Sequence, residues 1–171
     1  MRRQLITEQI EIFRSKPFVA GAIFWTYQDY RTRSNFIMGL VDFNRNRRGS
    51  WEVLREEYTP VLIDSLSFSP PIDGKRIATV ALHTRGPVDV DMPTYTLRGY
   101  SLHWAITSLD GSKNFSEGDV PLPTLAPASQ WSSDIQFAVP TEEYIITISI
   151  IRPTRYSVIE RSYSSKGELI P

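Results

Sequence analysis

The sequence predicts a mainly β protein in which an immunoglobulin-like antiparallel β-sandwich follows a short helix–strand–helix segment. Apolar residues recur at helical spacing in 4–14, but at every second position after about Val61. Turn signals such as Asp73-Gly74 and Asp110-Gly111 separate the later apolar runs. About seven short strands in roughly 110 residues fit a sandwich of this size. We therefore expect the chain to divide near residue 60.

Two helices are expected in the first sixty residues. The first covers 4–14 and is stopped by Pro17, and the second begins with Ser50 as its N-cap and ends at Pro60. Each has an apolar face at i, i+3/i+4, i+7 spacing. The two faces are formed by Ile6, Ile10 and Phe13, and by Trp51, Leu54 and Tyr58.

Between these helices, residues 18–27 are apolar at almost every position, which is typical of a strand covered on both faces in a parallel sheet. One strand between two helices has neither a partner strand nor cover for both faces. We therefore expect residues 1–60 to be part of a larger unit that includes polypeptide preceding Met1.

The second part, 61–171, alternates in the manner of half-buried strands. In "YSLHWAIT" the side chains of Tyr100, Leu102, Trp104 and Ile106 are expected on one face of the strand, with the intervening residues on the other. Further strands are expected at 76–83, 134–139, 144–151 and 156–163.

Composition narrows the classes of function. The 19 Lys and Arg balance the 19 Asp and Glu, so the basic footprint of a nucleic-acid-binding protein is missing. The chain has no cysteine for a disulfide or a thiolate metal site. We expect no signal peptide at the N-terminus, where acidic residues interrupt the apolar ones, and no apolar run reaches the ~18 residues that span a membrane. We expect a soluble protein, with the cytoplasm slightly favoured as its location.

Three segments resemble, in order, the C-terminal part of family 2 glycoside hydrolases, the β-galactosidase and β-glucuronidase group. They are "PFVAGAIFWTYQDYRTR", "MGLVDFNRNRRGSWEVLREEYTPV" and "DMPTYTLRGYSLHW". Within them, Gly21, Trp25 and Asp29 match a G-x-x-x-W-x-x-x-D-like stretch in the last strand of a (β/α)₈ barrel. The other matches are Gly39 to Asp42 with Arg45, Arg47 and Arg48, and Pro93 to Tyr100 in the following sandwich.

The resemblance implies that 1–60 is the C-terminal fragment of a (β/α)₈ barrel and 61–171 the sandwich after it. Trp25 would then lie where barrel active sites form and stack on a sugar ring. Asp29 and Arg31 would bind sugar hydroxyls or hold the neighbouring loop. The alternatives are that Trp25 only packs at the barrel rim, that Asp29 pairs with a nearby arginine, and that the Arg45, Arg47 and Arg48 cluster makes ion pairs or binds an anion.

The chain lacks the expected catalytic groups. Retaining glycosidases use two carboxyl groups about 5 to 5.5 Å apart, and the family supplies its acid/base glutamate from an Asn-Glu dipeptide, which is absent here. We therefore expect no catalytic residue in this chain and no hydrolysis by the chain alone. His83 and His103 fall on separate strands without metal-ligand spacing, so no metal or cofactor is expected.

The loop after the apolar run bears on the sugar. The β-glucuronidases of the family carry an Asn-x-Lys motif that recognises the sugar carboxylate, whereas Asn35 here has no lysine two residues on. A neutral sugar and a galactosidase-like parent are therefore favoured, with Arg31 or Arg33 as a possible substitute for the lysine.

Two functions follow as hypotheses. In the first, the chain is the C-terminal part of such a glycosidase and binds carbohydrate only within a complete barrel, associating with the rest of the barrel or with itself. In the second, it is a free-standing sandwich that binds carbohydrate or protein through Tyr95, Tyr100, Trp104 and Trp131. Neither involves nucleic acid or a membrane.

Overall fold

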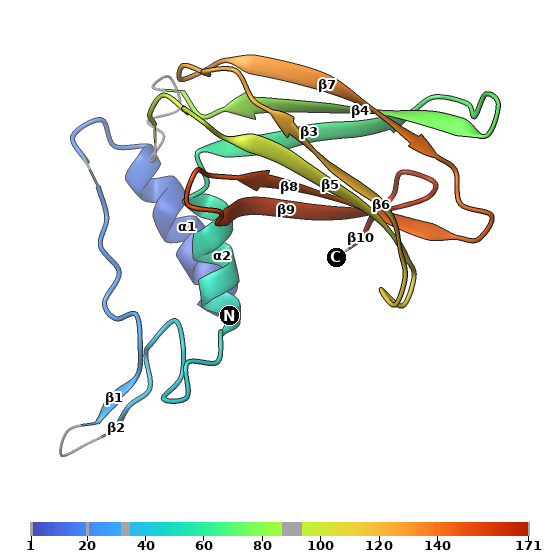
Figure 1. The fold of residues 1–171 in the computed structure, drawn as a ribbon. Coiled ribbons are helices and arrows are strands. Elements are labelled where there is room, and N and C mark those ends of the chain that lie inside the picture. The colour runs from blue at the N-terminus through green and yellow to red at the C-terminus, as the bar shows by residue number, and fades with distance from the viewer. Residues whose placement is uncertain (1, 20, 32–34, 87–93, 171) are drawn as a thin grey trace. The chain divides into compact units, whose positions relative to one another are not determined.

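The computed structural model describes residues 2–19, 21–31, 35–86 and 94–170. These residues form two compact units (Figure 1). The N-terminal unit contains the described residues up to Thr59, and the sandwich unit contains Pro60–Gly86 and 94–170. In the described part of the chain, no helix is both long and apolar enough to cross a membrane.

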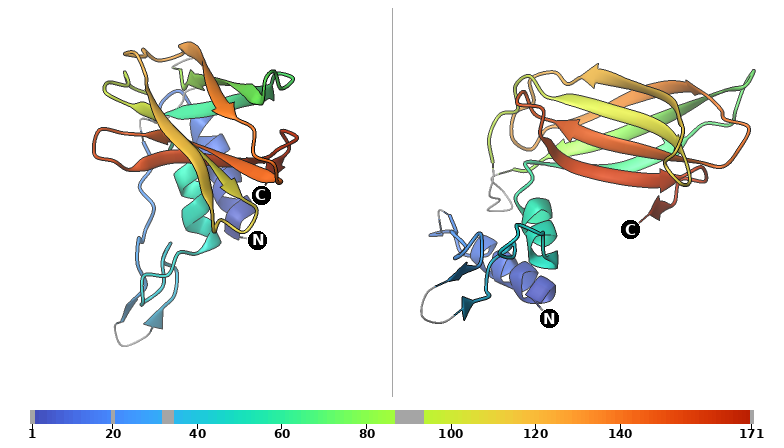
Figure 2. Two further views of the ribbon diagram at one scale, coloured as in Figure 1. Left: turned by 45° about the vertical axis from the view of Figure 1, so that its right-hand side comes forward. Right: turned by 60° about the horizontal axis from the view of Figure 1, so that its bottom comes forward.

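The sandwich unit consists of two antiparallel sheets, so the protein is mainly β as expected (Figures 1 and 2). One sheet has the order β3-β4-β7, and the other has the order β10-β9-β8-β5-β6. The strands of the first sheet are β3 (Val61–Phe68), β4 (Lys75–Thr84) and β7 (Gln130–Ala138). Those of the second are β5 (Ser101–Ser108), β6 (Asn114–Pro121), β8 (Tyr144–Ile151), β9 (Ser157–Ser164) and β10 (Leu169–Ile170).

The inward-facing side chains of the two sheets form one hydrophobic core. Every second residue of a strand contributes its side chain to this core, because successive side chains of a strand point to opposite faces. Along β5, Leu102 and Ile106 are fully buried and pair with Ile150 and Ile146 of β8. The largest fully buried apolar side chains of the core are Leu82, Leu97, Leu102, Ile106, Ile135, Ile146, Ile148, Ile150, Val61 and Val80.

The expected strands of this unit are present, with ends that differ by a few residues. The structure adds β3, β6 and the two-residue β10, which were not among the predicted runs. The alternation in β3 is interrupted by a bulge between Ile63 and Ser65, and β6 contains a glycine and several polar residues. Both β3 and β6 pair along their length with a strongly alternating strand, which provides the hydrogen-bonding partner that their own sequences do not indicate.

The turn predictions at Asp73-Gly74 and Asp110-Gly111 are confirmed. Asp73 and Gly74 both have positive φ, and they lie between Ile72 and Lys75, which exchange backbone hydrogen bonds. This is the backbone that a two-residue hairpin turn requires, and Asp-Gly adopts it readily. Gly111 also has a positive φ, in the connection between β5 and β6.

Gly118 on β6 should not tolerate a side chain. It lies opposite Trp104 of β5, and a Cβ at this position would approach the indole ring to 2.9 Å. Since an overpacked site forces neighbours off their rotamers, we expect Gly118→Ala to lower the free energy of unfolding by about 1 to 2 kcal/mol. Urea denaturation would measure this loss. It should be smaller in a Trp104→Phe background, and an equal loss in both backgrounds would contradict the contact as its cause.

Two helices of the N-terminal unit pack together. They are α1 (Arg2–Arg14) and α2 (Gly49–Glu57). The Arg14 guanidinium donates to the Glu57 carboxylate at 2.5 Å and to the Glu57 carbonyl oxygen at 2.6 Å. The predicted N-cap at Ser50 is wrong: Arg48 is the N-cap residue, and Ser50 is buried inside the first turn of α2.

The predicted buried strand over 18–27 is not present. The described residues of this segment form no strand, and the side chains of Phe18, Ile23 and Trp25 are 83%, 99% and 76% exposed. A strand of parallel type needs neighbours that hydrogen-bond to its backbone and cover its faces. The nearest regular structure is β1 (Tyr30–Arg31) paired with β2 (Asn35–Phe36). The barrel fragment is therefore not confirmed by this fold.

Candidate functional site

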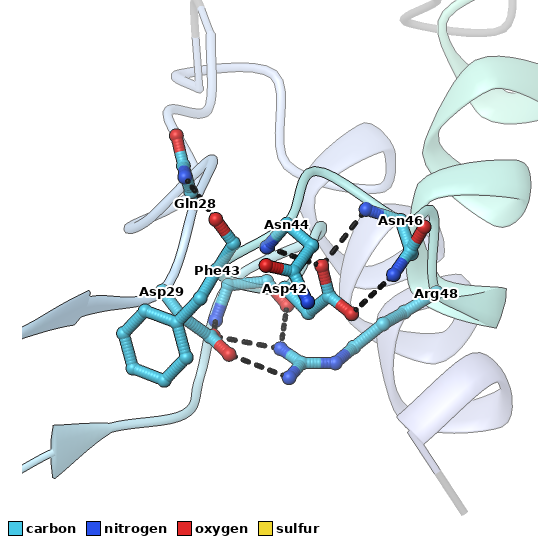
Figure 3. Close-up of polar contacts among 8 residues, drawn as sticks. Gln28, Asp29, Asp42, Phe43, Asn44, Asn46 and Arg48 are labelled. Carbon is cyan, nitrogen blue, oxygen red and sulfur yellow. Dashed lines mark hydrogen bonds and ion pairs between the residues drawn. The ribbon is translucent and has the colours of Figure 1, made fainter.

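A buried ion pair organises the chain just after the apolar segment (Figure 3). Arg48 donates from Nη1 to Oδ1 of Asp29 at 2.7 Å and from Nη2 to Oδ2 at 2.6 Å. The Asp29 side chain is almost fully buried, whereas that of Arg48 is partly exposed. The hydrogen bonds that Arg48 donates to Asp29 are the largest cause of the raised pKa of Arg48. Two parallel charge-assisted bonds fix both the distance and the plane of the two groups.

Gly39 completes the contacts of this pair. Its backbone N–H donates to Asp29 Oδ1 at 2.7 Å, and its carbonyl oxygen accepts from Arg48 Nη1 at 2.8 Å. A Cβ on Gly39 would lie within 2.6 Å of three backbone atoms, including the amide nitrogen of Asp29. Glycine is therefore required here because the two backbone segments touch.

Backbone hydrogen bonds hold three segments side by side around the ion pair. Val41 N–H donates to the carbonyl oxygen of Tyr27, and Asp29 N–H donates to that of Val41. This places Gln28 in a parallel bridge with Val41, which in turn bridges Arg47 in the antiparallel sense. Hydrogen bonds to Val41 therefore hold the end of the apolar segment in place, although the segment itself is not a strand.

Asp42 shapes the loop that leads to Arg48 (Figure 3). Its Oδ1 accepts from the backbone N–H groups of Asn44 and Asn46, and its Oδ2 accepts from the Asn46 side chain at 2.9 Å. The Asn46 side-chain bond is the main cause of a lowered pKa for Asp42. The carboxylate satisfies turn N–H groups, which is a structural role.

Aromatic side chains gather beside the ion pair. Tyr30 stacks on Phe36 with ring centroids 4.9 Å apart, and Trp25 meets Tyr30 edge to face at 6.4 Å. The Arg31 guanidinium lies 4.9 Å from the centroid of Phe43. Trp25 keeps most of its surface in solvent. We call Trp25, Tyr30 and Phe36 the aromatic surface. Arg31 and Phe43 form a separate contact, because successive side chains of β1 point to opposite faces.

The three predicted site residues therefore differ in their surroundings. Trp25 and Arg31 are exposed, Trp25 in the aromatic surface and Arg31 against Phe43, whereas Asp29 is buried and both of its carboxylate oxygens bind Arg48. This is the alternative in which Asp29 pairs with an arginine. Arg33 lies outside the described residues.

Sequence reasoning did not identify the partners of these residues. Arg48 was part of a recognised arginine cluster, but nothing in the sequence selected it over Arg47 as the partner of Asp29. Arg47 lies instead 3.9 Å from the ring centroid of Trp51. The roles of Phe36 and Phe43 also depend on the fold of the loop and have no signal in residue spacing.

The described residues hold no group of three or more His, Asp or Glu side chains placed to bind a metal ion. His83 Nδ1 lies 2.5 Å from Asp64 Oδ1, and His103 Nδ1 lies 3.1 Å from Asp119 Oδ1. These are separate histidine–carboxylate pairs at the surface of the sandwich.

The aromatic binding face expected for a free-standing sandwich does not form. Tyr100 is buried in the core, and Trp104 and Trp131 pack against the core. Of the four side chains only Tyr95 is exposed, and its hydroxyl lies 3.2 Å from that of Tyr100. Burial raises the pKa of Tyr100, with the bond to Tyr95 as a second cause. These aromatics stabilise the sandwich core.

Comparison with known proteins assigns no family. No family model matches the chain, and no curated protein matches it. Among solved structures, it is similar to the C-terminal domain of wzt, with 10% identity over 54% of this chain and 60% of the other, at a TM-score of 0.43. A glycosyl hydrolase family 2 member from Bacteroides cellulosilyticus DSM 14838 has 10% identity over 63% of this chain and a TM-score of 0.46. The Parabacteroides merdae β-glucuronidase has 11% identity over 61% and a TM-score of 0.38.

This chain spans 15% of the length of the Bacteroides protein and 14% of that of the Parabacteroides enzyme. Similarities with TM-scores below 0.5 give neither a family nor an activity to this chain.

Proposed function

We propose that this chain is the C-terminal part of a retaining glycoside hydrolase similar to the β-galactosidases and β-glucuronidases. In this proposal residues 1–60 complete a (β/α)₈ barrel, and 61–171 form an immunoglobulin-like sandwich beside it. The chain supplies a sugar-contacting surface, and other polypeptide supplies both catalytic carboxyl groups. The strand order β3-β4-β7 against β9-β8-β5-β6 supports the immunoglobulin-like class of sandwich.

The exposed apolar segment carries the proposal. Side chains as large as Phe18, Ile23 and Trp25 stand in solvent within one short stretch. Such an exposed apolar run marks a surface that is covered by another protein segment. A neighbouring barrel strand would hydrogen-bond the backbone and cover the side chains, which explains why almost every position of the segment is apolar or aromatic.

The ion pair explains how this segment would present Trp25 to a sugar. Asp29 and Arg48 fix the chain immediately after the segment, so Asp29 acts as a positioning residue. Trp25 then offers a flat apolar ring to the C–H face of a sugar, and Arg31 offers a guanidinium to hydroxyl oxygens. The missing Asn-x-Lys motif favours a neutral sugar.

Reconstitution tests this function. The coding sequence next to that of this chain is expected to encode further strand–helix units and an Asn-Glu dipeptide. The chain alone should not hydrolyse an aryl β-galactoside, and co-expression with that polypeptide should restore turnover. Trp25→Ala should then lower kcat/KM by about 100-fold, since it removes contacts made while the sugar reacts.

Tyr156→Ala is the matched control, because Tyr156 is an exposed aromatic residue of the sandwich unit. It should leave kcat/KM unchanged. Turnover by the chain alone that is abolished by a point mutation within it would refute the proposal. A neighbouring coding sequence without barrel units would refute it as well.

A further inference from the structure

The sandwich unit has a hollow on the outer face of its three-stranded sheet. Its volume is about 600 Å³, and it is lined by Asp64, Ala81, Leu82, Gln130, Trp131 and Ser132. The three strands β3, β4 and β7 form one layer of the sandwich (Figure 1).

The register of the sheet explains why there is a hollow. Ala81 occupies the central strand and pairs with Ser65 on one side and Ser132 on the other. All three side chains are small and point away from the core, since their neighbours Leu82 and Val80 are buried. Longer side chains from Asp64 and Gln130 stand beside them, so the floor at Ala81 lies lower than its surroundings.

The lining offers hydrogen-bonding groups that the described part of the chain does not use. Among the described residues, none pairs with the side-chain amide of Gln130 or the hydroxyl of Ser132. Asp64 Oδ1 lies 2.5 Å from His83 Nδ1, which orients the carboxylate, and no hydrogen bond within the described chain occupies its other oxygen. These groups supply both donors and acceptors.

The charge of the lining selects the class of ligand. None of the six lining residues is a lysine or an arginine, so the hollow lacks the cations that recognise phosphate or carboxylate groups. Its only charged lining group is one carboxylate beside a histidine. Vicinal hydroxyls of a sugar match a carboxylate and an amide, because each hydroxyl can donate to one and accept from the other.

We propose that this hollow, which we call the outer-sheet site, binds a neutral saccharide through Asp64, Gln130 and Ser132 above the floor at Ala81. This binding is non-catalytic and does not depend on the proposed glycosidase function. It would hold a carbohydrate chain on the sandwich whether or not a barrel is completed.

NMR titration of the full chain tests the outer-sheet site. The probes are glucose, galactose, mannose, xylose, lactose, maltose and cellobiose, each added separately. At least one should shift the backbone amide signals of Ala81, Gln130 and Ser132 saturably, with a dissociation constant of about 1 mM, as expected for a shallow polar site. Galacturonate should shift them at least tenfold less than galactose if galactose is the ligand.

Two variants with the same substitution make the test specific. Ala81→Leu fills the floor of the outer-sheet site and should abolish the shifts. Ala105→Leu is the matched control, because Ala105 lies on the outward side of β5 in the other sheet, and it should preserve them. Gln130→Ala should weaken binding by about tenfold, the effect of one lost hydrogen bond.

The proposal is overturned if none of the seven saccharides shifts these amides at about ten times the expected dissociation constant. It is also overturned if Ala81→Leu and Ala105→Leu bind equally, or if a tetralysine peptide saturates the site while the saccharides do not. None of these outcomes depends on hydrolysis, so they leave the glycosidase proposal untouched.

Discussion

Asp29→Ala is expected to open the loop of the N-terminal unit, with a loss of about 3 kcal/mol in local stability. Removing one partner of a buried ion pair leaves the other charge without compensation, which typically costs 3 to 5 kcal/mol. Here Arg48 would lose two charge-assisted bonds, and the Gly39 N–H would lose its acceptor. The loss should fall on the loop 39–48 and the end of the apolar segment.

Hydrogen exchange of the Gly39 and Val41 amides would measure this effect. A loss of about 3 kcal/mol corresponds to exchange that is faster by about 100-fold when exchange follows local opening. Arg48→Lys should give a smaller acceleration, because an ammonium keeps the charge but not the planar fork of donors. Glu11→Ala removes an exposed carboxylate from α1 and is the control. Equal exchange rates in the Asp29 and Glu11 variants would contradict the role assigned to the ion pair.

Arg76→Ala is expected to lower the free energy of unfolding of the sandwich unit by about 3 kcal/mol. Arg76 Nε donates to the Ser69 carbonyl oxygen, and Nη1 donates to the Tyr144 hydroxyl and the Ser165 carbonyl oxygen. Its guanidinium also lies 4.4 Å from the ring centroid of Phe68. A hydrogen bond to a charged group contributes roughly 1.5 to 3 kcal/mol net of its competition with water, and the contributions of several bonds from one side chain do not simply add. Arg76 lies on β4 in the three-stranded sheet, and its partner Ser69 follows β3 of the same sheet. Its other partners, Tyr144 and Ser165, lie at the start of β8 and just after β9 in the five-stranded sheet, so Arg76 connects the two sheets.

Thermal unfolding followed by circular dichroism would measure the loss. For a unit of this size about 3 kcal/mol corresponds to a decrease in Tm of roughly 10 °C. Arg98 is an exposed arginine of the same unit, so Arg98→Ala should change the Tm by no more than a degree or two, within the range of an ordinary surface substitution. Similar Tm values for the two variants would show that the contacts of Arg76 contribute little.

The strands of the sandwich were predictable where the sequence alternates strongly. The run 144–151 coincides with β8, and β5 differs from the predicted run by one residue at each end. In β6 the polar residues and Gly118 remove the alternating pattern by which a strand is predicted. The strand forms because the edge of β5 is available for pairing. Local propensity is weak evidence wherever a neighbouring strand supplies the hydrogen bonds.

In the apolar segment 18–27, by contrast, the sequence pattern predicts a strand that its described residues do not form. Its composition was interpreted as a buried strand, but a strand cannot form from composition alone, because its backbone groups need partners. For Asp29, the sequence offered both a sugar contact and an ion pair. Only the folded loop, which brings Arg48 and Gly39 to the two carboxylate oxygens, distinguishes them.

The sequence by itself determined the alternation of the sandwich strands, the hairpin turns and the first helix, because these depend on residues close together in the chain. Tertiary structure decided which arginine binds Asp29, which aromatic side chains enter the core, and where small residues leave a hollow on the sheet. These depend on contacts between residues that are distant in sequence. Their energies are set by burial and by hydrogen-bond geometry, which exist only once the chain is folded.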